Sequence, residues 1–180
     1  MLYISLFFGY NVKEMKIGGG MRMAIDKVKA YFRQYGLDEK VLEFDVSSAT
    51  VPLAAQALSC EPGRIAKTLA FLTPEGKPIL IVAAGDTKVD NPKYKAKFGK
   101  KPKMLTPEQA LELIGHGVGG VCPFAVNEGV TIYLDEKLKR FETVFPACGS
   151  SNSAIELTIP ELERYSGCKE WVDLCKMMEE

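Results

Sequence analysis

The chain has 180 residues, of which 47% are hydrophobic and 26% are charged. This length and composition are typical of one globular domain with a substantial core. Lysine and arginine together number 23, as do aspartate and glutamate, so the formal net charge is zero. The balance excludes a global electrostatic attraction to nucleic acid or to a membrane surface, and an anionic partner has to bind at a local basic patch.

Five cysteines are scattered along the chain without a C-x-x-C pair, and there is one histidine, His116. This pattern predicts neither a zinc ribbon nor a disulfide framework. Cysteines used in this way are typical of a reducing compartment, so we expect a cytoplasmic protein. With one histidine a histidine-rich metal site is not expected, and we predict no metal ion and no other cofactor.

Residues 1–22 differ in character from the rest of the chain. The apolar run from Leu2 to Tyr10 is too short to span a bilayer and lacks the basic leading segment of a signal peptide. Three glycines then precede Met21 and Met23. Two interpretations stay open, namely a mis-assigned start that includes a translated ribosome-binding site, and a genuine N-terminal extension packed on the domain. Residues 23–180 are predicted to form the domain.

The first half of the domain combines helical and strand patterns. Apolar residues recur at helical spacing from Ala24 to Tyr35, and residues 41–46 alternate between apolar and acidic side chains. Thr50 can cap a small-residue helix, and a Pro62-Gly63 turn leads into an apolar run. The predicted elements are a helix over 24–35, a half-buried strand over 41–46, a helix after Thr50, a strand over 64–71 and a central strand over 78–84.

The second half begins with seven lysines and one acidic residue between Lys88 and Lys103. Tyr94 and Phe98 lie four residues apart there and predict a short helix with an apolar seam. The further predicted strands lie at 104–105, 131–134, 143–147 and 154–158. Helices are predicted over 106–114, over 136–140 with Asp135 as the cap, and over 160–165 with Thr158 as the cap. A terminal helix is predicted from its apolar stripe of Trp171, Leu174, Cys175 and Met178. We therefore expect one compact α/β domain with a mixed, barrel-like β-sheet flanked by helices.

Lys67 stands in the middle of the predicted strand over 64–71, between Ile65 and Leu69. A strand interior is a costly place for an ammonium group unless the group faces a cleft or has a partner. Two interpretations are open: Lys67 points into a substrate pocket, or it lies on the solvated face of a half-exposed strand, as most lysines do.

The glycine-rich stretch from Gly115 to Pro123 follows a predicted helix instead of opening one, so it does not fit a dinucleotide-binding fingerprint. It can present backbone N–H groups to an anion or a carbonyl oxygen, or it can be a plain long turn. The lysine-rich stretch can likewise contact phosphates or form a solvated helix face. Cys122 and Cys148 are weak candidates for a nucleophile because no base is evident, and His116 is interpreted as structural or pocket-lining.

Five motifs follow one another along the chain. They are Pro62-Gly63-Arg64-Ile65-Ala66-Lys67-Thr68-Leu69, a strand ending in Gly85-Asp86, Gly119-Gly120-Val121-Cys122-Pro123-Phe124, Ile132-Tyr133-Leu134-Asp135, and Ile155-Glu156-Leu157-Thr158-Ile159-Pro160-Glu161-Leu162. In this order they resemble the YbaK/EbsC family, which includes free-standing relatives of the editing domain inserted in bacterial prolyl-tRNA synthetases. The resemblance covers nearly the whole domain, from about Ile25 to Gly167.

The resemblance implies a YbaK-like fold and a trans-editing deacylase that hydrolyses the ester of a mischarged tRNA, with Cys- or Ala-tRNA of the proline isoacceptor expected. It implies aminoacyl-tRNA as a partner and prolyl-tRNA synthetase as a further candidate partner. Binding to DNA or to a membrane is not expected. The lysine of the family corresponds to Lys67, the catalytic candidate. The substrate-binding candidates are Phe44, Thr50, His116, Gly119, Gly120, Val121, Cys122, Pro123, Cys148, Gly149 and Ser150, and the tRNA-phosphate candidates are Lys93, Lys95, Lys97, Lys100 and Lys101.

Three departures from the family pattern concern the pocket. The segment 148–152 lacks the basic pair that many relatives carry, Ala147 and Ala154 replace polar residues of some cysteinyl-tRNA deacylases, and His116 stands where relatives often have tyrosine. The alternative to an enzyme is therefore a tRNA- or synthetase-binding module with a degenerate, inactive pocket, and a small-metabolite binder is a third option. The resemblance does not require a side-chain nucleophile and implies attack by water, a tRNA hydroxyl or a thiol of the substrate, which agrees with the absence of a catalytic triad in the sequence.

Overall fold

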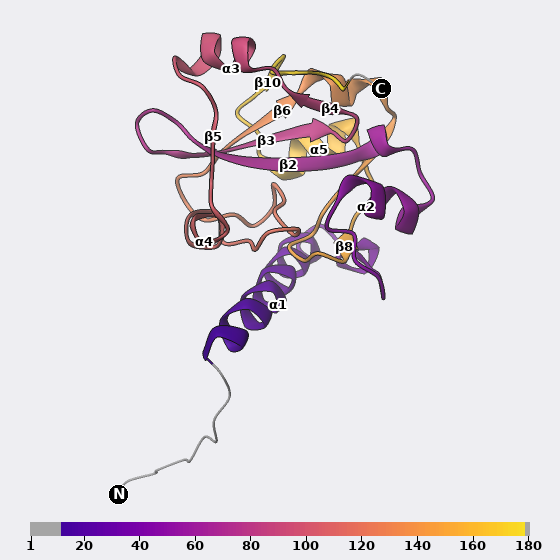
Figure 1. The fold of residues 1–180 in the computed structure, drawn as a ribbon. Helices are drawn as coiled ribbons and strands as arrows, with labels where there is room; N and C mark the ends of the chain where they lie inside the picture. The colour runs from indigo at the N-terminus through magenta and orange to yellow at the C-terminus, as the bar shows by residue number, and fades with distance from the viewer. Residues whose placement is uncertain (1–11, 179–180) are drawn as a thin grey trace, which may run out of the picture.

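The computed structural model describes residues 12–178 (Figure 1). The helices are α1 (Val12–Arg33), α2 (Val51–Leu58), α3 (Asn91–Phe98), α4 (Pro107–Gln109) and α5 (Ile159–Ser166), with single turns of helix at Asp38–Lys40, Pro62–Arg64, Ala110–Ile114 and Glu136–Arg140. The strands are β1 (Leu42–Glu43), β2 (Ile65–Leu72), β3 (Pro78–Ala84), β4 (Thr87–Val89), β5 (Lys103–Met104), β6 (Thr131–Asp135), β7 (Thr143–Pro146), β8 (Ser153–Ala154), β9 (Leu157–Thr158), β10 (Glu170–Val172) and β11 (Cys175–Met177).

The main sheet is mixed and has the strand order β10-β6-β3-β2-β7-β9, with β5 added to β2. β2 and β3 are antiparallel, with Ala66 opposite Ala84 and Leu72 opposite Pro78. β3 runs parallel to β6, and β2 runs parallel to β7. The predicted α/β domain with a mixed, barrel-like sheet is therefore confirmed, because this sheet curls into a half-barrel.

Successive side chains of β2 point to opposite faces of the sheet and enter two different apolar cores. Ala66 packs into the larger core together with Phe32 of α1 and Leu162 of α5. On the other face, Phe71 packs against Tyr94 of α3, with ring centroids 5.4 Å apart. Helix α1 thus lies on one side of β2 and α3 on the other (Figure 1), while Ala54 and Ala55 of α2 pack against Ile65 at the start of β2.

The predicted helix caps are confirmed at several positions. The Thr50 side chain accepts the N–H of Leu53 at the start of α2, and Asp135 caps the turn Glu136–Arg140. Thr158 forms a capping box with Glu161 at the start of α5. These caps were predictable because each satisfies local backbone donors within one turn of the chain.

The half-buried strand predicted over 41–46 is wrong. Strand β1 contains two exposed residues, and it pairs with β8 outside the main sheet. Val41 is buried, whereas Val46 is 60% exposed. The alternating pattern did not produce a longer strand because this segment has no neighbour in the main sheet, and of its apolar residues only Val41 belongs to the core.

The terminal helix predicted from Trp171 to Met178 is also wrong, since the chain forms β10 and β11 there. β10 runs parallel to β6. The buried carboxylate of Asp135 accepts the N–H groups of Leu174 and Cys175, each at 2.9 Å. A helical apolar spacing was therefore overridden by strand pairing and by a buried acceptor from a distant segment.

The interpretation of residues 1–22 is not tested by the structure. Residues 1–11 lie outside the described residues, and α1 is helical from Val12 onward. No helix in the described part of the chain has both the length and the apolar character needed to cross a membrane.

Candidate active site

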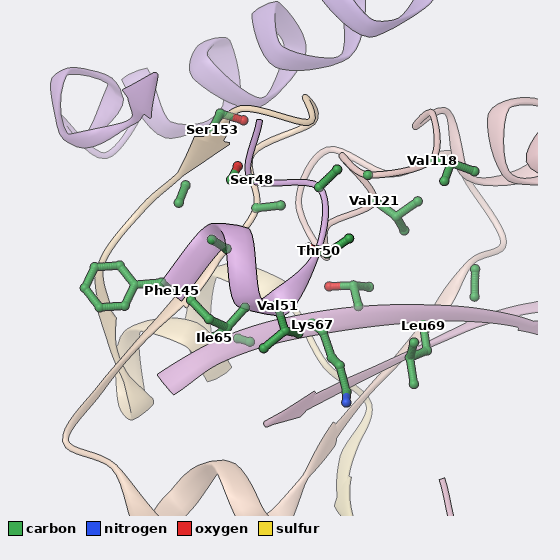
Figure 2. Close-up of a pocket in the computed structure, with 18 of the residues that line it drawn as sticks. Ser48, Thr50, Val51, Ile65, Lys67, Leu69, Val118, Val121, Phe145 and Ser153 are labelled. Carbon is green, nitrogen blue, oxygen red and sulfur yellow. The ribbon is translucent and has the colours of Figure 1, made fainter. Parts of the chain in front are cut away.

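A cavity of about 320 Å³ opens beside β2, between α2 and the glycine-rich loop (Figure 2). Most of its wall is apolar, and much of it consists of small side chains, namely Ala49, Ala54, Ala66, Ala70, Ala147 and Ala154. Polar groups come from Ser48, Thr50, Thr68 and Ser153. An apolar cleft with a few polar groups is the usual form of a small-ligand site.

The middle of β2 has an unpaired edge within this cavity. β7 pairs with the start of β2 and β5 with its end, and no strand covers the edge between them in the described structure. At this edge the carbonyl of Ala70 accepts the N–H of Leu105 at 3.0 Å. Backbone groups two residues apart in a strand point to the same side, so the N–H and C=O of Thr68 face the cavity.

The side chain of Thr68 adds a third polar group at this position. Its hydroxyl is buried and has no hydrogen-bond partner among the described residues. Buried polar groups are almost always bonded, so an unbonded hydroxyl beside an unpaired strand edge indicates a place where a ligand or a water molecule completes the hydrogen bonding.

Lys67 extends from β2 on the side away from Val118 and Val121 of the glycine-rich loop (Figure 2). Its ammonium donates to the carbonyl of Gly85 at 3.0 Å and to the carbonyl of Thr87. Burial lowers the pKa of Lys67 from its ordinary value. Because an ammonium group has three N–H donors, one donor remains for a ligand.

The glycine-rich loop forms the wall opposite β2. Gly119 has a φ of +86°, a conformation that favours glycine, and the N–H of Gly120 bonds to the carbonyl of Gly117 at 3.1 Å. The N–H groups of Gly119 and Val121 have no intramolecular acceptor within the described residues, and both residues line the cavity. The loop therefore has two backbone donors without an acceptor in the described structure, both in residues that border the cavity.

Gly120 and Gly149 bring three segments into backbone contact behind the loop. A Cβ atom on Gly120 would lie 2.6 Å from the carbonyl carbon of Gly149 and from the nitrogen of Ser150. A Cβ atom on Gly149 would lie 2.8 Å from the carbonyl of Ala24 in α1. These contacts fix the position of the loop relative to α1, and the two glycines lie behind the cavity wall.

His116, Cys122 and Cys148 are fully buried and do not line the cavity. The Nδ1 atom of His116 accepts the N–H of Cys122 at 3.2 Å, and the Sγ atom of Cys122 lies 3.5 Å from the same nitrogen. Burial lowers the pKa of His116 to about 4 and raises the pKa of Cys122 to about 12. Both groups are neutral at pH 7, so this pair fits a structural role and does not form a base–nucleophile pair.

We expect His116 to make the fold less stable as the pH falls from 6.5 toward 4. The unfolded imidazole, with its ordinary pKa of 6.5, binds a proton in this window that the folded imidazole, with a pKa of about 4, does not bind. The stability present above pH 6.5 is therefore lost as the pH falls, by ~3 kcal/mol in total. Urea unfolding at a series of pH values measures this slope.

The matched variant for this prediction is His116→Asn, whose amide oxygen can still accept the Cys122 N–H but does not titrate. Its free energy of unfolding should change less with pH between 6.5 and 4 than that of the wild type. Parallel pH curves for the two proteins would contradict the prediction.

The structure brings together only part of the predicted set of catalytic and substrate-binding residues. Thr50, Lys67, Gly119 and Val121 line the cavity, whereas His116, Gly120, Cys122, Pro123, Cys148, Gly149 and Ser150 form a buried layer behind the loop. Phe44 lies outside the cavity, where its carbonyl accepts the Asn152 side-chain N–H at 2.7 Å. Sequence reasoning missed Ser48, Thr68 and Ser153 as lining residues, although Thr68 was signalled by its place next to Lys67.

The predicted phosphate-binding lysines divide into two groups. Lys93 forms an ion pair with Asp173 at 2.7 Å, and Lys97 forms one with Glu170 at 2.9 Å. Lys95, Lys100 and Lys101 are exposed and have no acidic partner among residues 12–178. In the same part of the chain, no three His, Cys, Asp or Glu side chains are grouped to hold a metal ion.

Residues 46–165 match the family of aminoacyl-tRNA editing domains. The chain belongs to this family. This aminoacyl-tRNA editing domain is 51% identical over 154 residues to the uncharacterized protein YwhH of Bacillus subtilis (strain 168), and the match covers 86% of the chain and 98% of YwhH. This family match, together with the relative EbsC described next, confirms the resemblance to the YbaK/EbsC family.

Two further relatives connect the editing domain to named activities. The protein EbsC of Enterococcus faecalis, a proposed Cys-tRNA(Pro)/Cys-tRNA(Cys) deacylase, is 30% identical over 104 residues, which cover 57% of the chain and 63% of EbsC. The crystal structure of a proposed trans-editing enzyme for prolyl tRNA synthetase superimposes with a TM-score of 0.76 at 31% identity, covering 85% of the chain and 97% of that protein.

Proposed function

We propose that this protein is a trans-editing aminoacyl-tRNA deacylase that removes a small amino acid, cysteine or alanine, from tRNA of the proline isoacceptor. One observation carries the proposal: an editing domain contains a cavity of about 320 Å³ with an alanine-rich wall and an unpaired strand edge. The match to YwhH extends over 98% of that protein, which supports an editing domain that acts apart from a synthetase.

The unpaired edge at Thr68 suits the α-amino acid part of the substrate. The carbonyl of Thr68 can accept an N–H of the α-ammonium group, while its N–H donates to the ester carbonyl, as between two residues of an antiparallel ladder. Ala66 and Ala154 are buried parts of the surrounding wall. Small walls of this kind leave space for the side chain of alanine or cysteine and exclude charged side chains.

The reaction proceeds by attack of a water oxygen on the ester carbonyl carbon. The bond from that carbon to the ribose oxygen breaks, and the products are a free amino acid and a tRNA with a free hydroxyl group. Negative charge develops on the carbonyl oxygen, where the N–H groups of Gly119 and Val121 can stabilise it. The remaining donor of Lys67 lies on the other side of β2, where it can hold the ribose or phosphate of the terminal nucleotide. The buried, protonated thiol of Cys122 takes no part.

The test is a deacylation panel with tRNA of the proline isoacceptor charged with alanine, cysteine or proline. We expect the purified protein to release alanine or cysteine faster than proline. A Lys77→Ala variant, altered at an exposed position away from the cavity, is the control and should match the wild type. No release of any of the three amino acids would contradict the proposal.

A binding module without turnover is the second candidate. It is favoured by the orientation of Lys67, whose ammonium is bonded to the carbonyls of Gly85 and Thr87 on the side away from the glycine-rich loop. In that case the same protein binds tRNA with an affinity that falls as salt rises, and it hydrolyses none of the esters in the panel.

A further inference from the structure

A second cavity, of about 480 Å³, lies against the face of β2 that carries Lys67 and Leu69. It shares these two residues and Met104 of β5 with the first cavity. Because the edge of β2 between β5 and β7 is unpaired, the two cavities meet around this edge. A ligand held in the first cavity can therefore continue into the second.

All charged groups that line the second cavity are basic, namely Lys67, Lys88 and Lys101. Lys88 of β4 stands directly opposite Lys176 of β11, and like charges at such positions repel each other. The carboxylate of Asp90 lies 3.9 Å from Lys176, but neither Lys88 nor Lys101 has an acidic partner within the described residues. This uncompensated positive charge is suited to an anion.

The remaining wall of the second cavity is largely apolar, with Leu69, Met104 and Met178 among its residues. Met104 and Met178 are 59% and 47% exposed, so their side chains are available to a ligand. Proteins hold single-stranded nucleic acid in a positively charged groove that binds the phosphates, beside side chains, usually aromatic, on which the bases stack. Here the surface available to a base is aliphatic, formed by Leu69, Met104 and Met178.

Lys93 and Lys97 of α3 do not offer an equivalent site. Lys93 and Lys97 line a third cavity together with Asp173, and both are engaged in ion pairs. That cavity shares no residue with the first one. Of the two basic regions, only the one at Lys88 and Lys101 adjoins the proposed ester site.

We propose that the second cavity binds the single-stranded 3′ end of the tRNA, with phosphodiester groups at Lys88 and Lys101 and a base against Leu69, Met104 and Met178. This inference rests on the proposed function. The amino acid is esterified to the ribose of the last nucleotide, so that nucleotide lies within one ester linkage of the first cavity. The second cavity adjoins the first and carries the positive charge needed to bind the phosphates of the tRNA 3′ end.

The test compares two double variants with the same change in charge, Lys88→Ala/Lys101→Ala and the control Lys93→Ala/Lys97→Ala. Binding of uncharged tRNA of the proline isoacceptor is titrated at several salt concentrations. We expect the first variant to bind tRNA about tenfold more weakly than the wild type. The plot of log association constant against log salt concentration should become less steep by about 1.4, which is ~0.7 for each lost contact to a single-strand phosphate. The control should bind within twofold of the wild type.

A second measurement uses hydrolysis of an alanyl ester on this tRNA and on adenosine alone. The Lys88→Ala/Lys101→Ala variant should lose kcat/KM on the tRNA ester and keep it on alanyl-adenosine, which has no phosphodiester. Equal weakening of tRNA binding by both double variants, or equal loss on both esters, would overturn the inference.

The two proposals fail in different ways. If the wild type binds tRNA through Lys88 and Lys101 but hydrolyses no ester, the deacylase proposal fails and the second cavity stands as an RNA site. If the wild type hydrolyses the tRNA ester and the Lys88→Ala/Lys101→Ala variant is unchanged in binding and in kcat/KM, the proposal for the second cavity is wrong and the deacylase proposal is supported.

Discussion

Replacing Lys67 by methionine is expected to lower kcat/KM for deacylation about 100-fold, the loss that a small displacement of a bound substrate causes when a group that positions it is removed. Methionine keeps an apolar stem of similar length beside both cavities and removes only the ammonium group. Steady-state hydrolysis of alanyl-tRNA of the proline isoacceptor measures the effect, with Lys77→Met as the matched control at an exposed position.

The same substitution has a separate effect on stability. Without the ammonium, the carbonyls of Gly85 and Thr87 lose a partly buried donor, and we expect the free energy of unfolding to fall by ~1–2 kcal/mol. Urea unfolding of Lys67→Met shows whether the protein in the kinetic assay is folded. A folded variant with activity within a few fold of the wild type would reduce Lys67 to a structural clamp of the turn after β3.

Replacing Gly120 by alanine is expected to lower the free energy of unfolding by about 3 kcal/mol. The added Cβ atom would lie 2.6 Å from backbone atoms of Gly149 and Ser150, and backbone atoms cannot move aside as a flexible side chain can. The glycine-rich loop would have to shift away from the 148–150 turn, which would also displace the N–H groups of Gly119 and Val121 from the cavity.

The matched control is Gly129→Ala, because Gly129 has a φ of +83° and an added Cβ atom would meet nothing within 4 Å. That variant carries only the conformational penalty of a side chain in the left-handed region, ~1 kcal/mol. Chemical unfolding of both variants separates steric contact from backbone strain. Because Gly120 does not have a left-handed φ, a free energy of unfolding unchanged in Gly120→Ala would show that the close contact behind the loop does not contribute.

Local signals in the sequence predicted much of the scaffold of the site. The Pro62-Gly63 turn, β2 and the caps at Thr50 and Thr158 depend on residues within a few positions of one another, and the structure has each of them. The cavity itself was partly predicted, since Lys67 and the loop around Gly119 lie at its border. The layer that contains His116 and Cys148 was placed near the substrate by motif, but burial removes it from the cavity surface.

The chain by itself therefore determined the family, the α/β class and the strand that carries Lys67, because these depend on motif order and on apolar periodicity. Only the tertiary structure decided where the ammonium of Lys67 points, because its two acceptors lie 18 and 20 residues away on the turn after β3. It also decided that β2 has an unpaired edge, since β5 and β7 reach it from distant parts of the chain. The tertiary structure also decided which lysines are neutralised, because Lys93 and Lys97 form ion pairs with acidic residues of the C-terminal segment. Charge pairing between distant segments leaves no periodic signal in the sequence.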